Sequence, residues 1–120
     1  MSAKEVQRRE LQSYERADGS CVFTDWFDAL DAIAASKVTK ALAKLERGLG
    51  DLKPVGEGVS ELRINFGPGY RVYFGQDRDV LVILLCGGTK KRQQDDINQA
   101  TTLWAEYKVR KHGQTKTIKT

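Results

Sequence analysis

The fold of this chain is decided by the stretch VSELRINFGPGYRVYF, which covers residues 59–74. Apolar and polar side chains alternate on both sides of Gly67-Pro68-Gly69, and this pattern predicts two strands joined by a tight turn. The alternation places Arg63 and Arg71 on the same exposed face of the hairpin. Like charges on paired strands repel each other, so a bound polyanion would stabilise this arrangement.

A third strand is expected at residues 80–86, after a turn over residues 76–79. Because its side chains are apolar on both faces, we expect it to lie inside the sheet, with helices covering one side. Gly87-Gly88-Thr89 is expected to end this strand. A final helix is then expected to open at Asp95 and Asp96.

Two helices are predicted before the hairpin. The first has apolar side chains at three- and four-residue steps, namely Phe23, Trp26, Phe27, Leu30 and Ile33. The second is expected to begin at a capping Ser36 and to end at Gly48 and Gly50. The two helices would form a hairpin joined near residues 35–36, and residues 5–14 are expected to form a short, exposed edge strand.

The expected order of elements is β-α-α-β-β-β-α, with no strand assigned around Pro54 and Gly56. This order predicts an α+β domain in which an N-terminal helical hairpin and a C-terminal helix pack on a small antiparallel sheet. Residues 1–108 are expected to form the domain. Residues 109–120 are polar and basic and lack periodicity, so we expect a flexible tail.

The composition favours a single globular domain. The chain has 120 residues, 40% of them hydrophobic and 30% charged, as is usual for a soluble protein with one core. The longest apolar run, residues 80–85, is too short to cross a membrane. The first residues are charged, unlike those of a secretory signal. We therefore expect a cytoplasmic protein with no membrane partner.

Metal and disulfide chemistry are not favoured. The chain has two cysteines, Cys21 and Cys86, and one histidine, with no Cys-x-x-Cys spacing. We therefore expect no metal and no small-molecule cofactor. Reduced thiols are expected, and a single Cys21–Cys86 disulfide is the alternative.

Basic charge is concentrated in two parts of the chain. The net charge is +4, but residues 58–92 hold six Lys or Arg against three acidic residues, and residues 108–120 hold five cations and no acid. Basic stretches of this kind favour a polyanionic partner through counterion release. The alternative is an ordinary solvated surface.

The Lys-Lys-Arg run at residues 90–92 follows the third strand of the hairpin region. A loop at this point can reach over the face that carries Arg63 and Arg71. A purely structural alternative is that Glu61 pairs with one of these arginines while the run only solvates the start of a helix.

Three motifs make the sequence resemble a known family. They are GVSELRI (58–64), GPGYRVYF (67–74) and LLCGGTK (84–90). Together they resemble the RelE/ParE toxin superfamily over residues 4–107, and more narrowly its HigB-like, phage-related addiction module killer branch. The resemblance implies a RelE/ParE-like fold and the toxin of a type II toxin–antitoxin module. It also implies a metal-independent endoribonuclease, an mRNA interferase that cuts mRNA on the ribosome and has a helix-turn-helix antitoxin as its partner.

The resemblance also implies a set of catalytic residues. Arg71 matches the arginine of the Gly-Tyr-Arg element, Arg63 matches a basic strand position, and Lys90 matches the basic residue after the glycines. Cleavage of RNA at its own 2′-hydroxyl requires stabilisation of the phosphorane charge, for which two guanidinium groups are suited. Lys90 is the predicted proton-transfer residue, because neighbouring cations favour the neutral form of an amine.

Further side chains are predicted to contact the substrate. Tyr73 is expected to orient a nucleotide or stack on a base, and the other predicted contacts are Asn65, Lys91 and Arg92. Toxins of this type often have an aromatic base near the start of the final helix. This chain has Asp95-Asp96-Ile97 there, so the general base is left unassigned.

Two other functions fit the same sequence. A ParE-like protein with this fold would inhibit DNA gyrase without nuclease chemistry. A non-catalytic module would bind nucleic acid or an antitoxin through the sheet and the basic tail. The Arg63, Arg71 and Lys90 set favours the nuclease.

Overall fold

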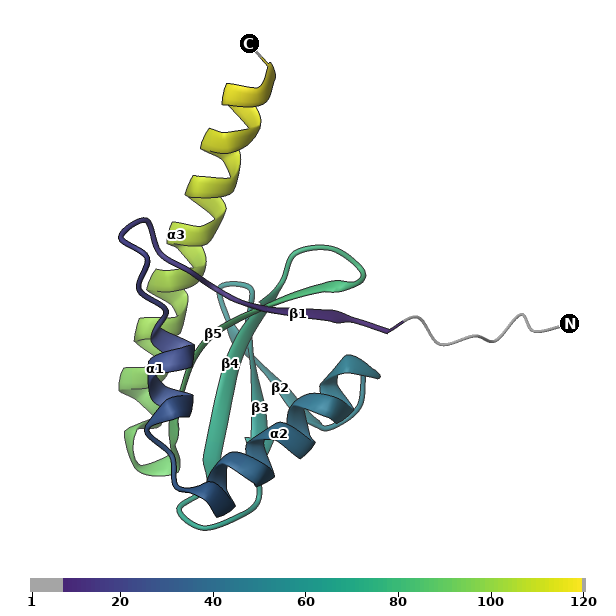
Figure 1. Ribbon diagram of the computed structural model, residues 1–120, viewed down its shortest axis with the longest axis vertical. Helices are drawn as coiled ribbons and strands as arrows, with labels where there is room; N and C mark the ends of the chain where they lie inside the picture. Colours follow the sequence, from purple (N-terminus) through teal and green to yellow (C-terminus); the bar gives the residue numbers. More distant parts are fainter. Residues whose placement is uncertain (1–7, 120) are drawn as a thin grey trace, which may run out of the picture.

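The computed structural model describes residues 8–119 of the chain, and the side chains of residues 8–111. It contains a five-stranded sheet and three α-helices (Figure 1). The strands are β1 (Glu10–Ser13), β2 (Asp51–Gly56), β3 (Val59–Ile64), β4 (Tyr70–Gln76) and β5 (Leu81–Thr89). The helices are α1 (Val22–Asp28), α2 (Ala32–Glu46) and α3 (Gln93–Lys119), and a 3₁₀ turn, η1 (Lys90–Arg92), precedes α3. The predicted α+β class is confirmed.

The strands lie in the order β1-β5-β4-β3-β2. The predicted hairpin is confirmed as β3 and β4, and Arg63 is the direct cross-strand partner of Arg71. The prediction of an antiparallel sheet is wrong for one pair of strands, because β1 pairs with β5 in parallel. The two helices and three strands that separate β1 from β5 make this long crossover. β1 lies at an edge of the sheet, as predicted for residues 5–14, of which residues 5–7 are outside the described part.

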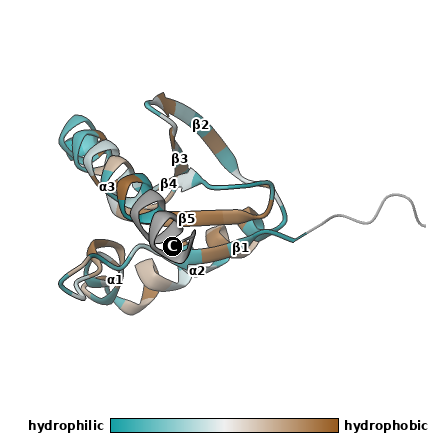
Figure 2. Ribbon diagram, turned by 90° about the horizontal axis from the view of Figure 1, so that it is seen from above, coloured by the Kyte–Doolittle hydropathy of each residue, from teal (hydrophilic) through white to brown (hydrophobic). Residues whose placement is uncertain are grey.

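Helices cover both faces of the sheet. α1 and α2 lie on one face and α3 on the other, so β5, brown over most of its length in Figure 2, is buried between α1 and α3. The prediction that β5 lies inside the sheet is confirmed, but the prediction that helices cover it on one side only is wrong. The core on the α1 and α2 side includes Phe23, Val38, Leu45, Leu62, Val72 and Val82. The core on the α3 side includes Tyr14, Val59, Tyr73, Ile83, Leu103 and Trp104.

The strand β2 was not predicted, so the order of elements is β-α-α-β-β-β-β-α. Pro54 and Gly56 are usual strand breakers, and five of its six residues are exposed, so no apolar alternation marks it. β2 is an edge strand. Proline is tolerated at an edge because its position there can face the side on which no strand pairs, so the absent N–H costs no ladder hydrogen bond. The strand matters because Asp51 is the cross-strand partner of Arg63.

The joint between α1 and α2 lies earlier than predicted. α1 ends at Asp28 and α2 begins at Ala32, so Ser36 lies inside α2 and does not cap it. Asp31 is the N-cap, and its carboxylate accepts a hydrogen bond from the backbone N–H of Ala34 at 2.8 Å. This bond satisfies a backbone donor that the first turn of a helix leaves free. Both helices bury their apolar side chains against the sheet rather than forming a separate hairpin core.

The Asp31 cap predicts a measurable loss of stability on substitution. Asp31→Ala is expected to lower the free energy of unfolding by about 1 kcal/mol, the usual cost of losing an N-cap. Urea denaturation measures this change. Asp28→Ala is the matched control, because Asp28 ends α1 and has an unfavourable position at the negative end of the helix. An equal loss in both variants would contradict the capping role.

Gly87 and Gly88 continue β5 instead of ending it, pairing with Val72 and Arg71 of β4. The predicted break at these glycines is therefore wrong. They are needed because other groups pack directly on the strand. A Cβ on Gly87 would overlap the ring of Trp26, and a Cβ on Gly88 would overlap the carboxylate of Asp96.

α3 is longer than predicted at both ends. It begins at Gln93, two residues before Asp95, and it continues to Lys119, where no helix was expected (Figure 1). The flexibility expected of residues 109–120 stays a prediction. No proline interrupts them, and the preceding turns of helix remove the cost of nucleation. Arg110 donates to the backbone oxygen of Glu15, which ties this part of the helix to the domain.

Cys21 and Cys86 are both free thiols, as predicted. Burial raises the pKa of the Cys86 thiol to about 12. None of the helices in the described part of the chain has the length and apolarity that a membrane crossing requires. Among these same residues, no three His, Cys, Asp or Glu side chains gather as metal ligands would.

Candidate functional site

A pocket of about 330 Å³ lies where the β3–β4 hairpin turns beside the start of η1. It is lined by Asp51, Arg63, Ile64, Asn65, Gly69, Tyr70, Arg71 and Lys90. Four of the predicted site residues, including all three predicted catalytic residues, therefore meet in one pocket. The turn and η1 touch directly, since the Lys90 backbone N–H donates to the Pro68 oxygen and a Cβ on Gly69 would lie 3.2 Å from Lys90 Cβ.

Arg71 is largely buried, with 10% of its side chain exposed. Its Nη1 lies 3.1 Å from Glu61 Oε2, so the structural alternative in which Glu61 pairs with an arginine of the hairpin is realised here. Its Nε is buried and has no hydrogen-bond partner among the described residues. A buried guanidinium donor without a partner is costly. The exposed part of the Arg71 side chain lines the pocket, where a cation suits an anionic ligand.

Arg63 is paired with a residue that the sequence did not connect to it. Its Nη2 donates to Asp51 Oδ1 at 2.9 Å, with the two side chains 39% and 60% exposed. Its Nε, like that of Arg71, has no partner within the described part of the chain. The polar–apolar–polar order of Asp51-Leu52-Lys53 is the sequence signal for a strand that carries Asp51 beside Arg63. Pro54 interrupts this alternation, so the strand was not predicted.

Tyr73 is completely buried, so it is not available to stack on a nucleotide base, as was predicted. The reason is that α3 covers this part of the face that the alternation predicted to be exposed. Its hydroxyl donates to Glu61 Oε2 at 2.9 Å. Burial, followed by this hydrogen bond, raises the pKa of Tyr73.

The Lys-Lys-Arg run does not act as one unit. Lys90 lines the pocket, whereas Lys91 and Arg92 are exposed and outside its lining. Arg92 lies 3.9 Å from Asp95 along the start of α3. Of the predicted substrate contacts, Asn65 alone therefore lies in the lining.

Neither aspartate at the start of α3 lines this pocket. Asp95 is exposed. Asp96 is buried with its Oδ2 unpaired, and burial raises the pKa of its carboxyl group. The helix start therefore supplies no carboxylate to the pocket, and the general base stays unassigned.

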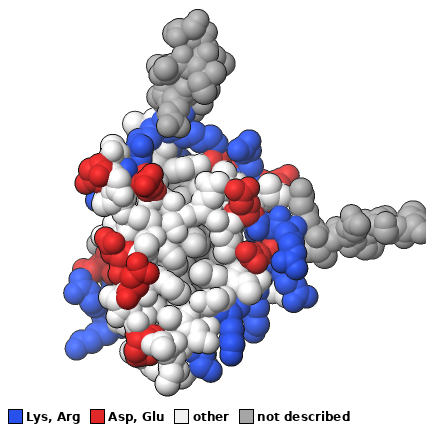
Figure 3. Space-filling model, viewed as in Figure 1, with Lys and Arg blue, Asp and Glu red and all other residues white. Residues whose placement is uncertain are grey.

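A basic surface adjoins the pocket on the side of α2. Lys37, Lys40 and Lys44 are exposed on this helix, and Figure 3 shows blue side chains over its position in the view of Figure 1. Lys37 Nζ lies 5.0 Å from the centre of the Phe66 ring, which stacks on Tyr70 of the pocket lining. Positive charge therefore continues from the pocket to α2.

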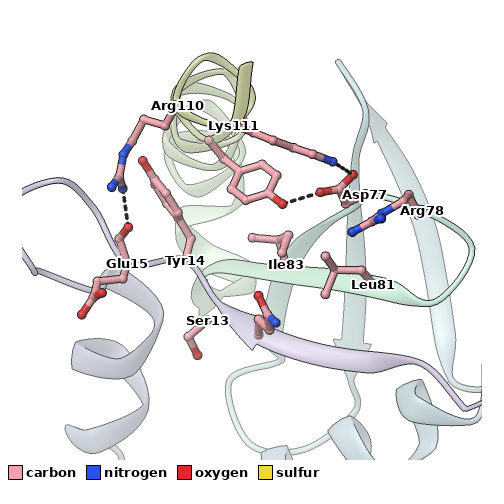
Figure 4. Close-up of a pocket in the computed structure, with 11 residues that line it drawn as sticks. Ser13, Tyr14, Glu15, Asp77, Arg78, Leu81, Ile83, Arg110 and Lys111 are labelled. Carbon is pink, nitrogen blue, oxygen red and sulfur yellow. Dashed lines mark hydrogen bonds and ion pairs between the residues drawn. The ribbon is translucent and has the colours of Figure 1, made fainter. Parts of the chain in front are cut away.

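A second pocket of about 370 Å³ lies between β1, the β4–β5 turn and α3 (Figure 4). Three of its polar side chains pair with one another, since Tyr107 and Lys111 both contact Asp77. Burial, together with the hydrogen bond to Asp77, raises the pKa of Tyr107 to about 12. Because no unpaired buried donor lines this pocket in the described structure, the hairpin pocket is the better candidate for an anion site.

Comparisons with known proteins place this chain in a family. The family model described as "Phage derived protein Gp49-like (DUF891)" matches residues 25–108, which include the whole lining of the hairpin pocket. An uncharacterized protein of Haemophilus influenzae (strain Rd) is 45% identical over 86 residues, which is 70% of this chain and 87% of that protein. No solved structure matched the chain. The chain belongs to the Gp49-like family of phage-derived proteins, a family of RelE-type addiction module toxins.

Proposed function

We propose that this protein is a HigB-like toxin of a type II toxin–antitoxin module that cleaves mRNA on the ribosome and so inhibits translation. The observation that carries the proposal is that the guanidinium groups of Arg63 and Arg71 line one pocket. These arginines face each other across β3 and β4, and Lys90 lines the same pocket. Such a set of donors suits a phosphate group.

The proposed reaction uses cationic side chains and no metal. The 2′-oxygen of the RNA attacks the adjacent phosphorus, and the bond from phosphorus to the 5′-oxygen breaks. The products are a 2′,3′-cyclic phosphate and a 5′-hydroxyl end. Arg63 and Arg71 stabilise the charge that develops on the phosphorane oxygens. Lys90 serves the proton transfer of this step, in which the 2′-hydroxyl loses a proton and the leaving 5′-oxygen gains one.

The surroundings of the pocket support a polynucleotide substrate. A volume of about 330 Å³ is small for a folded partner but suits a phosphate and its sugar. The exposed lysines of α2 extend the positive surface beyond the pocket, where they would neutralise further phosphates. The family membership implies an antitoxin partner. We propose that this antitoxin is a helix-turn-helix protein, and that the toxin acts in the cytoplasm on the ribosome and its mRNA.

Primer extension on cellular mRNA tests the proposed function. After brief induction of the protein, cuts spaced by codons within translated regions are expected. The same cuts should be absent when translation is first stopped by an inhibitor of initiation. Intact mRNA together with stalled replication would instead identify a gyrase inhibitor and overturn the proposal.

Asp51 provides a prediction at the pocket itself. Because its carboxylate occupies one side of the Arg63 guanidinium, it competes with an incoming phosphate. Asp51→Asn is expected to tighten binding of a short RNA about threefold and to steepen the salt dependence. Fluorescence anisotropy at two salt concentrations measures both effects.

Asp95→Asn is the matched control for Asp51→Asn. Asp95 is also exposed and lies near an arginine, Arg92, but it is outside the pocket lining. It should change the affinity less than Asp51→Asn. If the two variants bind RNA equally, Asp51 does not compete at the site.

A further inference from the structure

Glu61 is a fully buried carboxylate whose contacts join two parts of the site. Its Oε2 accepts hydrogen bonds from Tyr73 Oη and Gln93 Nε2, each at 2.9 Å, and it lies 3.1 Å from Arg71 Nη1. Its Oε1 is buried without a partner among the described residues. Tyr73 and Arg71 belong to β4, while Gln93 is the first residue of α3.

Stability alone does not explain a charged group at this position. A buried ion pair gains little over apolar side chains of similar size, because removing two charges from water offsets their attraction. The unpaired Oε1 of Glu61 and the unpaired Nε of Arg71 add a further cost. A contact that is expensive and incomplete suggests a role in holding a functional group.

The protein has a second glutamate that contacts one tyrosine and one arginine, and its ion pair is bidentate. Glu106 accepts hydrogen bonds from Tyr14 Oη at 2.6 Å and from Arg16 Nε and Nη2 at 3.0 Å. Both donors on the guanidinium edge that faces Glu106 are therefore used. At Glu61 the residue types are the same, but the arginine is held by Nη1 alone and its Nε is left without a partner.

We propose that Glu61 is a positioning residue that fixes the Arg71 guanidinium, so that the part of the group that lines the pocket is held ready to bind the substrate phosphate. Through Gln93 it also fixes the start of α3, and with it Lys90, which lies three residues earlier. Glu61 is not in the pocket lining and does not touch the substrate. This inference rests on the proposed nuclease function for its catalytic consequence, but the immobilisation of Arg71 stands apart from it.

Nuclear magnetic resonance of the arginine side chains tests the immobilisation directly. In the wild-type protein the Nη protons of Arg71 and Arg16 should give separate, slowly exchanging signals. Glu61→Gln should average the Arg71 signals and leave those of Arg16 unchanged. Glu106→Gln, the matched control, should do the reverse. If the Arg71 signals are averaged in the wild type, or stay separate in Glu61→Gln, Glu61 does not hold Arg71 and the proposal fails.

A cleavage assay with purified ribosomes and mRNA tests the catalytic consequence. Glu61→Gln should lower kcat at least tenfold with a smaller change in KM, because a displaced donor is lost mainly from the transition state. Glu61→Asp keeps the charge but shortens the reach, so positioning predicts no rescue. Full activity of Glu61→Asp would show that only the charge matters and would overturn the proposal.

Tyr73→Phe keeps the inference testable if Glu61→Gln does not fold. It removes one hydrogen bond to Glu61 and leaves the charges in place. It should partly average the Arg71 signals and lower kcat a few-fold, whereas unchanged signals and an unchanged kcat would count against positioning. If the wild type cleaves no mRNA, the proposed function fails, and the arginine signals still decide whether Glu61 holds Arg71.

Discussion

Arg71→Ala is expected to lower the rate of mRNA cleavage by about 10²–10³-fold, the usual effect of removing one donor that stabilises transition-state charge. Arg71 supplies the most buried cation of the pocket, with 10% of its side chain exposed. Cells that express the variant should grow. Arg71→Lys should also be nearly inactive, because an ammonium group lacks the planar pair of donors.

The control for Arg71→Ala is Arg16→Ala. Arg16 is likewise paired with a glutamate and adjacent to a tyrosine contact, but it is outside the hairpin pocket. This variant should remain toxic. Removing Arg71 leaves the charge of Glu61 buried, at a cost of about 3–5 kcal/mol, so circular dichroism must show that the variant is folded.

Lys90→Ala tests the same site without disturbing the core, because Lys90 is exposed. It should slow cleavage by about 10²-fold or more, as loss of a proton-transfer residue does. If Arg71→Ala is folded and both it and Lys90→Ala cut mRNA at the wild-type rate, the hairpin pocket is not the catalytic site.

The part of the site that lies on the hairpin could be predicted from the sequence. A strand has a period of two, and the Gly-Pro-Gly turn fixes the register, so the pairing of Arg63 with Arg71 follows from local rules. Lys90 joins them because β5 is the next neighbour of β4, which places the end of β5 beside the hairpin turn. The three predicted catalytic residues therefore depend on contacts between consecutive strands.

The rest of the site depends on contacts that local patterns do not encode. Alternation shows which side chains share a face, but not that α3 covers Tyr73 and Glu61. Asp51 was missed because a polar edge strand with a proline has no apolar period. Gly87 and Gly88 were assigned to a break, although side chains from distant segments require their small size. In each case a long-range packing contact overrides the local signal.

Trp104→Ala is expected to lower the free energy of unfolding by about 3–5 kcal/mol, as large-to-small changes in a core do. Trp104 is 6% exposed, and it joins α3 to the sheet. Its ring stacks on Tyr107 with the ring centres 5.2 Å apart. The ring also lies directly over Gly75 of β4, where an added Cβ would be 2.5 Å from it. Urea denaturation measures the loss.

Gly75→Ala turns this contact into a test of the packing. The added methyl group collides with the indole ring, so the single variant should lose about 1–3 kcal/mol. In the Trp104→Ala background the ring is gone and the methyl group enters the cavity, so the second substitution should cost close to nothing. The two changes would then be strongly non-additive, as expected for residues in direct contact.

Gly87→Ala provides the control for this cycle, because its methyl group would meet Trp26 on the opposite face of the sheet. Its cost should be the same with and without Trp104, since the two sites share no partner. Additive behaviour of Gly75→Ala with Trp104→Ala would show that the indole ring does not rest on Gly75. The packing of α3 on β4 would then be wrong. The burial of Tyr73 and Glu61 under α3 would be wrong as well.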